Sequence, residues 1–315
     1  MLRSPSMSQV PSLVAAAALL IAALSGGWEN VNLVAGRAAA APPAAAARPI
    51  KLEWMTDYGD AMKRAELGRK MLLVYFYDKE PGEAQRRFER ESLTDAQVLQ
   101  RLQNFMVVRL PTDYEVSVGG ERSKLMEHDA FAELNGKPGA AIIDFAHDAE
   151  DYHGYVVSIL PLSDGKYYRF TPKHLSTLLD LPPGTLTQRT MIFAVRIHPE
   201  APQSTRGRLS SVLTGEAREH SRHQARIRVQ GHHNWSHRFQ RITGLLPFGL
   251  RAQEVVAESW PNEGLVDAAI DCVDSWRQSP GNWGAVVSDQ PHYGYDIKRG
   301  ENGIWYATGL FGNSE

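Results

Sequence analysis

The chain has 315 residues, of which 43% are hydrophobic and 22% charged, as in a folded soluble protein long enough for two domains. Its net charge of −2 argues against a role for the whole chain on nucleic acid or acidic membranes. The single cysteine, Cys272, excludes an intramolecular disulfide, a CxxC redox pair and a cysteine-based zinc site.

The N-terminus has the layout of a secretory signal peptide. Arg3 precedes the apolar segment 13–24, which is shorter than the roughly 20 residues that cross a bilayer as a stable helix. An Ala/Pro-rich tether, "AAAAPPAAAARP", follows at 38–49. We therefore predict a signal and tether over 1–48 and a secreted or periplasmic bacterial protein. An uncleaved signal that anchors the chain is the open alternative, and it would be the chain's one contact with a membrane.

The next stretch alternates helix and strand patterns. Helical spacing of apolar residues predicts helices at 58–70, 94–105 and 172–181. Apolar runs predict strands at 71–77, 106–111, 139–145 and 155–161. This order predicts an α/β fold in which helices cover both faces of a sheet.

The strand "KMLLVYFY", the helix after it and "NGKPGAAIIDF" resemble the thioredoxin-like fold. The resemblance covers the predicted domain 49–183 and makes Pro138 the candidate for the family's cis-proline. Where the family has its CxxC, this chain has "DKEPGEAQRRFE" at 78–89, and without a thiol there is no nucleophile for disulfide exchange. We therefore expect a thioredoxin-like scaffold without redox activity; an unrelated α/β domain is the alternative.

Pro182-Pro183-Gly184 interrupts the helical pattern and predicts a domain boundary at 183/184. Beyond it, helices are predicted at 189–200, 207–231 and 265–276, the last with Cys272 on its buried face. The segments 293–298 and 303–311 flank Arg-Gly-Glu-Asn and predict a β-hairpin.

Four segments in this half follow one another in a familiar order: "EHSRHQARIRVQGHHNW", "AQEVVAES", "VDSWRQSPGNW" and "NGIWYATGLFG". Together they resemble the CAP superfamily (SCP-like, pathogenesis-related type). The resemblance implies a CAP/SCP-like α-β-α sandwich over 184–315, after the thioredoxin-like domain.

The CAP resemblance also implies a cleft with two histidines and two acids, which in some members bind a divalent cation such as zinc. The first histidine falls on His233, or on His232 if the break shifts by one, and the acids fall on Glu254 and Asp274. The second histidine falls on Asn282, whose neutral amide is a poor zinc ligand and no general base. His233, Glu254 and Asp274 remain the candidate ligands, for a weakly bound hard divalent cation at most. No other cofactor is predicted.

Ser279-Pro280-Gly281 predicts a turn that delivers Asn282 into this cleft. Histidines 220 and 223 lie three residues apart on one predicted helix, as joint metal ligands would, although His220 on the apolar face favours a structural role. The arginines at 218, 222, 226 and 228 predict a solvated helix face, with contact to phosphate or anionic lipid as the alternative.

These patterns favour a non-enzymatic binding or interaction protein whose ligand is an envelope lipid, peptide, glycan or protein, and not nucleic acid. A metal-assisted hydrolase or protease centred on His233, Glu254 and Asp274 is the first alternative. A thiol-independent, chaperone-like relative of thioredoxin is the second.

Overall fold

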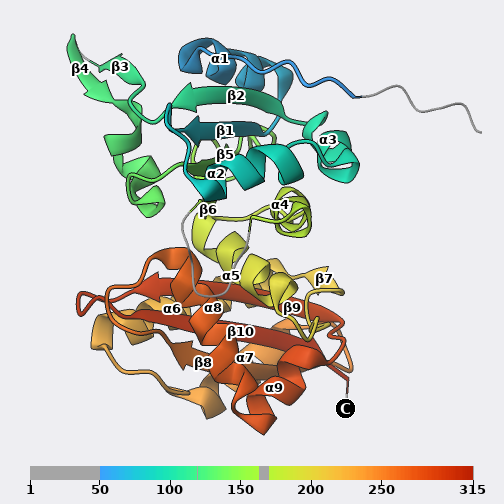
Figure 1. The fold of residues 1–315 in the computed structure, drawn as a ribbon. Helices are drawn as coiled ribbons and strands as arrows, with labels where there is room; N and C mark the ends of the chain where they lie inside the picture. Colours follow the sequence, from blue (N-terminus) through green and yellow to red (C-terminus); the bar gives the residue numbers. More distant parts are fainter. Residues whose placement is uncertain (1–49, 119, 163–169, 315) are drawn as a thin grey trace, which may run out of the picture. The chain divides into compact units, whose positions relative to one another are not determined.

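A computed structural model describes residues 50–118, 120–162 and 170–314 of the chain (Figure 1). Residues 49–315 form one unit, distinct from residues 1–48. The predicted signal and the predicted tether lie outside the described residues. Within the described residues, no helix combines the length and the apolar character needed to span a membrane.

The first sheet has the strand order β2-β1-β5-β6. β1 runs parallel to β2 and antiparallel to β5, which in turn runs antiparallel to β6. The strands span Leu72–Tyr77 (β1), Met106–Pro111 (β2), Gly139–Ile143 (β5) and Val156–Pro161 (β6). They match the four predicted strands, and β1, β5 and β6 are buried on both faces, which explains their continuous apolar runs.

Helices cover both faces of this sheet. Alternate residues of β1 enter different cores: Leu72 and Val74 pack with Ala65 of α1, whereas Leu73 and Tyr75 pack with residues of α3 and α4. The helical segments are Tyr58–Gly68 (α1), Glu83–Arg87 (α2), the π-helical turn Phe88–Ser92, Ala96–Leu102 (α3) and Pro172–Leu179 (α4). The predicted α/β class is confirmed for this half.

A second hairpin, which the sequence patterns do not predict, projects from this half. Its strands are β3 (Glu115–Val118) and β4 (Glu121–Lys124), and two 3-10 turns follow at Leu125–Glu127 and Asp129–Leu134. All four residues of β4 are exposed, so this strand carries no apolar face, and in β3 Val116 packs against the core.

The second sheet has the order β7-β9-β10-β8. β9 and β10 form the predicted antiparallel hairpin, β8 pairs antiparallel with β10, and β7 pairs parallel with β9. The strands span Arg208–Leu209 (β7), Arg251–Glu258 (β8), His292–Arg299 (β9) and Trp305–Asn313 (β10).

Helices lie on both faces of the second sheet as well, giving the predicted α-β-α layers (Figure 1). Leu310 of β10 packs with Leu213 and Ile242 on one face, and the next residue, Phe311, packs in the same cluster as Trp276 on the other. The first layer contains α6 (Ser211–Ile227) and α7 (Trp235–Leu245). The second contains α5 (Leu186–Ile197), α8 (Leu265–Arg277) and α9 (Pro280–Val287).

The Ser-Pro-Gly sequence predicted as a turn begins a helix instead. Ser279 is the N-cap of α9, and Pro280 occupies its first position. Proline suits that position because its missing N–H would have no partner there and its fixed φ matches the helix. Asn282 therefore lies in the first turn of α9 and not at the exit of a loop.

Helix α5 contacts both sheets, through β6 of the first and β9 of the second. One cluster of buried residues includes side chains from β1, α4, α5, α8 and β10. The predicted boundary at 183/184 falls between α4 and α5, next to this shared core, and stays a prediction.

Arg189 of α5 is the largest charged side chain in this core and is 1% exposed. Its guanidinium donates to the Ser158 hydroxyl on β6 at 2.8 Å and to the carbonyls of Leu181 and Pro182 at 2.9 and 2.8 Å. Burial lowers the pKa of Arg189 to about 10, so the side chain stays charged at neutral pH. This arginine ties α5 to β6 and to the end of α4.

Candidate functional site

Glu254 is the buried acid of the predicted cleft. It lies on β8 opposite Leu310, on the face covered by α6 and α7, and its side chain is 1% exposed. His232 Nδ1 donates to its Oε1 at 3.0 Å, and Arg238 Nη2 donates to its Oε2 at 2.5 Å. Both carboxylate oxygens therefore already have strong donors within the protein.

These donors keep Glu254 ionised. Burial alone would raise the pKa of Glu254, but the hydrogen bonds from His232 and Arg238 hold it below its usual value. A carboxylate that both a guanidinium and an imidazole hold is a poor general base, because taking up a proton would break charge-assisted bonds.

His220 lies on the buried side of this cluster. Its side chain is 2% exposed, and its Nε2 lies 2.9 Å from the Gly231 carbonyl and 3.7 Å from Glu254 Oε1. Burial lowers the pKa of His220 to about 4, so the ring is neutral at neutral pH and donates from Nε2 to the carbonyl. This is the structural role that its place on the apolar face favours.

His233, the first choice for the cleft histidine, lies beside this cluster and does not contact Glu254. Its Nε2 donates to the Val229 carbonyl at 3.1 Å, and its ring lies 5.4 Å from that of His223 and 6.0 Å from that of His220, between centroids. The one-residue shift weighed in the sequence therefore places His232, and not His233, next to the carboxylate.

Asp274, the second predicted acid, takes part in a different cluster. Its Oδ1 lies 3.4 Å from Nε2 of His198, whose ring lies 4.8 Å from that of Trp283 between centroids. Burial lowers the pKa of His198 despite the nearby Asp274 charge. This cluster joins the end of α5 to α8 and to Trp283 of α9, and its partners differ from those of Glu254.

The donor set does not fit a zinc ion. In the part of the chain that the structure describes, no group of three or more His, Cys, Asp or Glu side chains is placed to hold a metal. Arg238 also stands where a cation would approach Glu254, and two positive groups on one carboxylate repel each other. The weak binding of a hard divalent cation stays a prediction.

In the first half, a closed polar network occupies the loop that would carry the redox pair. Gln85 accepts from the Asp78 N–H at 2.9 Å and donates to Glu89 Oε1 at 3.1 Å. Glu89 Oε1 also accepts from the Tyr75 hydroxyl and from Arg109, each at 2.8 Å. Pro138 directly precedes β5, where the thioredoxin resemblance places its cis-proline, and the isomer of its peptide bond stays a prediction.

Cys272, the one thiol of the chain, lies in α8 and is fully buried. Burial raises the pKa of this thiol well above its ordinary value, so little thiolate is present at neutral pH. The prediction of a buried core cysteine is confirmed.

The sequence analysis did not identify Arg238, whose hydrogen bond to Glu254 helps to keep that carboxylate ionised. Arg238 follows the surface-like segment "NWSH" and shares α7 with the exposed Arg241, so no local pattern separates the two arginines. Its pairing with Glu254 depends on how α7 packs on β8, which the order of residues alone does not reveal.

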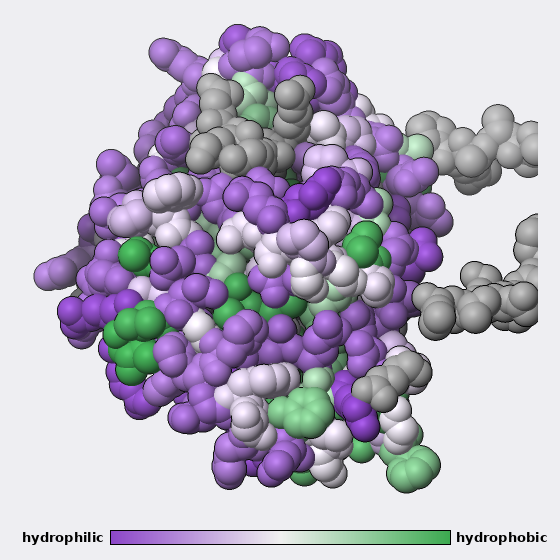
Figure 2. Space-filling model, turned by 90° about the horizontal axis from the view of Figure 1, so that it is seen from below, coloured by the Kyte–Doolittle hydropathy of each residue, from purple (hydrophilic) through white to green (hydrophobic). Residues whose placement is uncertain are grey.

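Figure 2 shows one face of the molecule, where hydrophobic residues form small groups separated by hydrophilic ones. Among the described residues, the large exposed hydrophobic side chains include Phe248, which is wholly exposed at 108%, and Trp260 at 68%. Single exposed side chains of this kind are common on soluble proteins and do not by themselves mark an interface.

No protein-family model and no curated protein matches the chain. Among solved structures, it is similar to an outer surface protein from Borrelia burgdorferi, with 19% identity, over 35% of this chain and 78% of that one. The TM-score of 0.29 is too low for this likeness to carry any conclusion about fold or function.

Proposed function

We propose that this chain is an exported, non-enzymatic binding or interaction protein of the cell envelope, built from thioredoxin-like and CAP-like halves that lack the reactive groups of those families. Its ligand would be an envelope lipid, peptide, glycan or protein. Each half would then serve as a scaffold and not as a catalyst.

The ion pair between Arg238 and Glu254 carries this proposal. Arg238 Nη2 lies 2.5 Å from Glu254 Oε2, and both side chains are shielded from water, with 11% and 1% exposed. Charged pairs of this kind are costly to separate once they are buried. A hydrolase centred on Glu254 would have to break this pair to free its base or metal ligand.

The first half supports the same interpretation. Its loop after β1 has no thiol, and Glu89 is held there by Tyr75, Gln85 and Arg109. Thiol exchange therefore has no nucleophile in this loop. The chaperone-like alternative needs no thiol and stays a prediction.

An activity screen tests the proposal. The full chain is incubated with casein and with small ester substrates, with and without added zinc, and compared with the Glu254→Gln variant. We expect the same background rate for both proteins, because Glu254 takes no part in chemistry. Since glutamine has nearly the same shape, circular dichroism should show that the variant is folded.

Hydrolysis by the wild-type chain that Glu254→Gln abolishes, in a variant shown to be folded, would overturn the proposal and favour the hydrolase alternative. An Asp289→Asn variant serves as a matched control, because Asp289 is an exposed acid just beyond α9. Its rate should equal that of the wild-type chain in either case.

A further inference from the structure

The chain contains two Asn-Gly dipeptides, Asn135-Gly136 and Asn302-Gly303, and both lie in turns. Asparagine is a chemically labile residue, and it is most labile before glycine, whose backbone nitrogen is not shielded by a side chain. That nitrogen can attack the side-chain carbonyl carbon of the asparagine. Because the two dipeptides have the same intrinsic chemistry, a difference in their reactivity must come from the structure around them.

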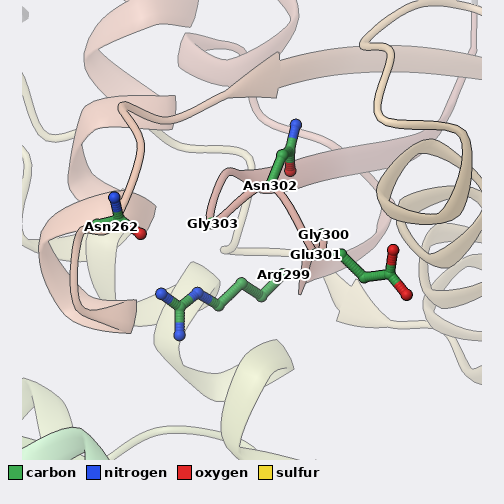
Figure 3. A pocket seen from close by; sticks show the side chains of 6 residues that line it. All are labelled: Asn262, Arg299, Gly300, Glu301, Asn302 and Gly303. Carbon is green, nitrogen blue, oxygen red and sulfur yellow. The ribbon is translucent and has the colours of Figure 1, made fainter.

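In the turn between β9 and β10, hydrogen bonds hold both reacting groups of Asn302-Gly303. The Asn302 amide donates to the Tyr306 hydroxyl at 2.9 Å, and its carbonyl oxygen accepts from the Ile304 N–H at 3.3 Å. The Gly303 N–H donates to the Gly300 carbonyl at 3.0 Å. Figure 3 shows the Asn302 side chain extending from the turn on the side away from Gly303. The nitrogen and the carbon that would have to meet are therefore held apart.

The surroundings of Gly303 make this turn hard to open. Gly303 is buried, and its carbonyl accepts from the Asn262 N–H at 2.9 Å. Its φ of 77° suits glycine, and a Cβ at this position would clash with the Asn262 side chain. The Gly303 nitrogen can therefore react only after part of this turn has unfolded locally.

Asn135-Gly136 has neither restraint. The dipeptide follows the 3-10 turn Asp129–Leu134, and both of its residues are exposed. Among the residues that the structure describes, the Asn135 side-chain amide and the Gly136 N–H make no hydrogen bond. A bond from the Lys137 N–H to the Leu134 carbonyl at 3.0 Å closes the turn and leaves both reacting groups outside it.

We propose that Asn135 is a site of spontaneous modification in the folded chain, whereas Asn302 is protected. In the first step the Gly136 nitrogen bonds to Cγ of Asn135, its proton passes to the side-chain nitrogen, and ammonia leaves a succinimide ring. In the second step water adds to one of the two ring carbonyl carbons, and the ring nitrogen takes up a proton as its bond breaks. Opening on one side gives aspartate, and opening on the other gives isoaspartate. The inference goes beyond the proposed function and does not depend on its ligand.

The product would change a contact between the two halves of the chain. Glu133 Oε2 accepts from the Leu265 N–H at 2.8 Å, at the start of α8. A Cβ on Gly264, the N-cap of α8, would lie 3.4 Å from Asn135 Nδ2 and 3.9 Å from Glu133 Oε2. A carboxylate at position 135 would thus add like-charge repulsion next to Glu133. Isoaspartate would also lengthen the backbone of the turn.

Peptide mapping of the full chain by mass spectrometry tests the inference. The folded protein is kept in warm, mildly alkaline buffer, and the peptides that contain Asn135 and Asn302 are followed over time. Each conversion raises the mass of a peptide by the difference between a hydroxyl and an amino group. We expect Asn135 to react about tenfold faster than Asn302 or more, because three hydrogen bonds must open at Asn302-Gly303.

Two variants and an unfolded sample serve as controls. Asn135→Gly removes the amide and tolerates the φ of 53° at this position, so the mass gain there should vanish. Tyr306→Phe removes the acceptor of the Asn302 amide but keeps the ring, so Asn302 should react about fivefold faster. The rate at Asn135 should not change in Tyr306→Phe, which also shows that this variant is folded. In concentrated urea, the two dipeptides should react at similar rates.

Equal rates at Asn135 and Asn302 in the folded chain, or no reaction at Asn135, would overturn the inference. The same ratio of rates in urea and in buffer would also overturn it, because the difference would then be intrinsic to the two segments. Each of these results would leave the proposed non-catalytic role intact, since that role is judged by Glu254-dependent hydrolysis.

Discussion

The surroundings of Glu254 and the turn between β9 and β10 both carry arginine side chains, but they differ in how the charges are balanced. At Glu254, Arg238 and His232 bind a carboxylate that is 1% exposed, so every charge has a fixed partner. At the turn, Arg299 is exposed and its guanidinium has no partner among the described residues. The first arrangement stabilises the fold, whereas the second contributes little to it.

The difference shows that cationic side chains in this half play different parts. Arg238 belongs to an internal ion pair at a predicted cleft position, whereas Arg299 makes no hydrogen bond or ion pair with the described residues.

The largest change in stability is expected when Arg238 is removed. Arg238→Met leaves the Glu254 charge buried without its main partner, and we expect a loss of about 3 to 5 kcal/mol in the free energy of unfolding. Urea denaturation followed by circular dichroism measures this change. Arg241→Met on the same helix removes an exposed pair with Glu216 and should cost about 1 kcal/mol or less.

A double variant tests whether the unpaired charge of Glu254 causes this loss of stability. Glu254→Leu combined with Arg238→Met replaces the ion pair by apolar groups of similar volume, and it should be more stable than Arg238→Met alone. If the single and double variants are equally stable, Arg238 does not compensate the buried charge of Glu254.

The next largest effect is expected from acid, which should destabilise the cluster formed by Glu254, His220, His232 and Arg238. The folded-state pKa of His220 is about 4, below its ordinary value of 6.5, so the folded protein takes up this proton less readily than the unfolded chain. The stability from His220 is complete above pH 6.5 and is lost as the pH falls toward 4, by about 3 kcal/mol at most.

Urea denaturation at pH values from 7.5 to 4 checks this dependence. His220→Gln should flatten the decline over that window, whereas His237→Gln, which changes an exposed histidine on α7, should leave it unchanged. An identical decline in the wild-type chain and in His220→Gln would show that other groups govern the acid sensitivity.

The smallest effect is expected at Arg299. Arg299→Ala should change the free energy of unfolding by less than about 0.5 kcal/mol, because the side chain is exposed and makes no hydrogen bond or ion pair with the described residues. A thermal melt checks this expectation, and Arg64→Ala, which removes an exposed arginine of α1, is the control. A clear destabilisation would mean that Arg299 is structural, like Arg238.

Much of the order of helices and strands could be predicted from the sequence because it depends on local patterns, although α7 and β8 were not among the predicted elements. The continuous run at β1 and the helical spacing in α6 are both consequences of which faces are buried. The β3–β4 hairpin was not predicted because β4 is exposed throughout and its strands are only four residues long, and α9 was not predicted because Ser-Pro-Gly can begin a helix as well as form a turn.

The candidate site could be predicted only in part. The sequence named Glu254 and His232 as candidates for one cleft, and the structure brings them together, but Arg238 approaches Glu254 from a separate helix and leaves no trace in local sequence. The same holds for Arg189, whose guanidinium is satisfied by carbonyls of Leu181 and Pro182 that any residues could supply. Contacts of this kind depend on tertiary packing.

Calorimetric titration of the full chain with zinc at neutral pH, beside Glu254→Gln, tests the central claim most directly. The claim is that Arg238 and His232 occupy the Glu254 carboxylate, so we predict that neither protein takes up one equivalent of zinc. Stoichiometric uptake by the wild-type chain that Glu254→Gln abolishes would contradict it.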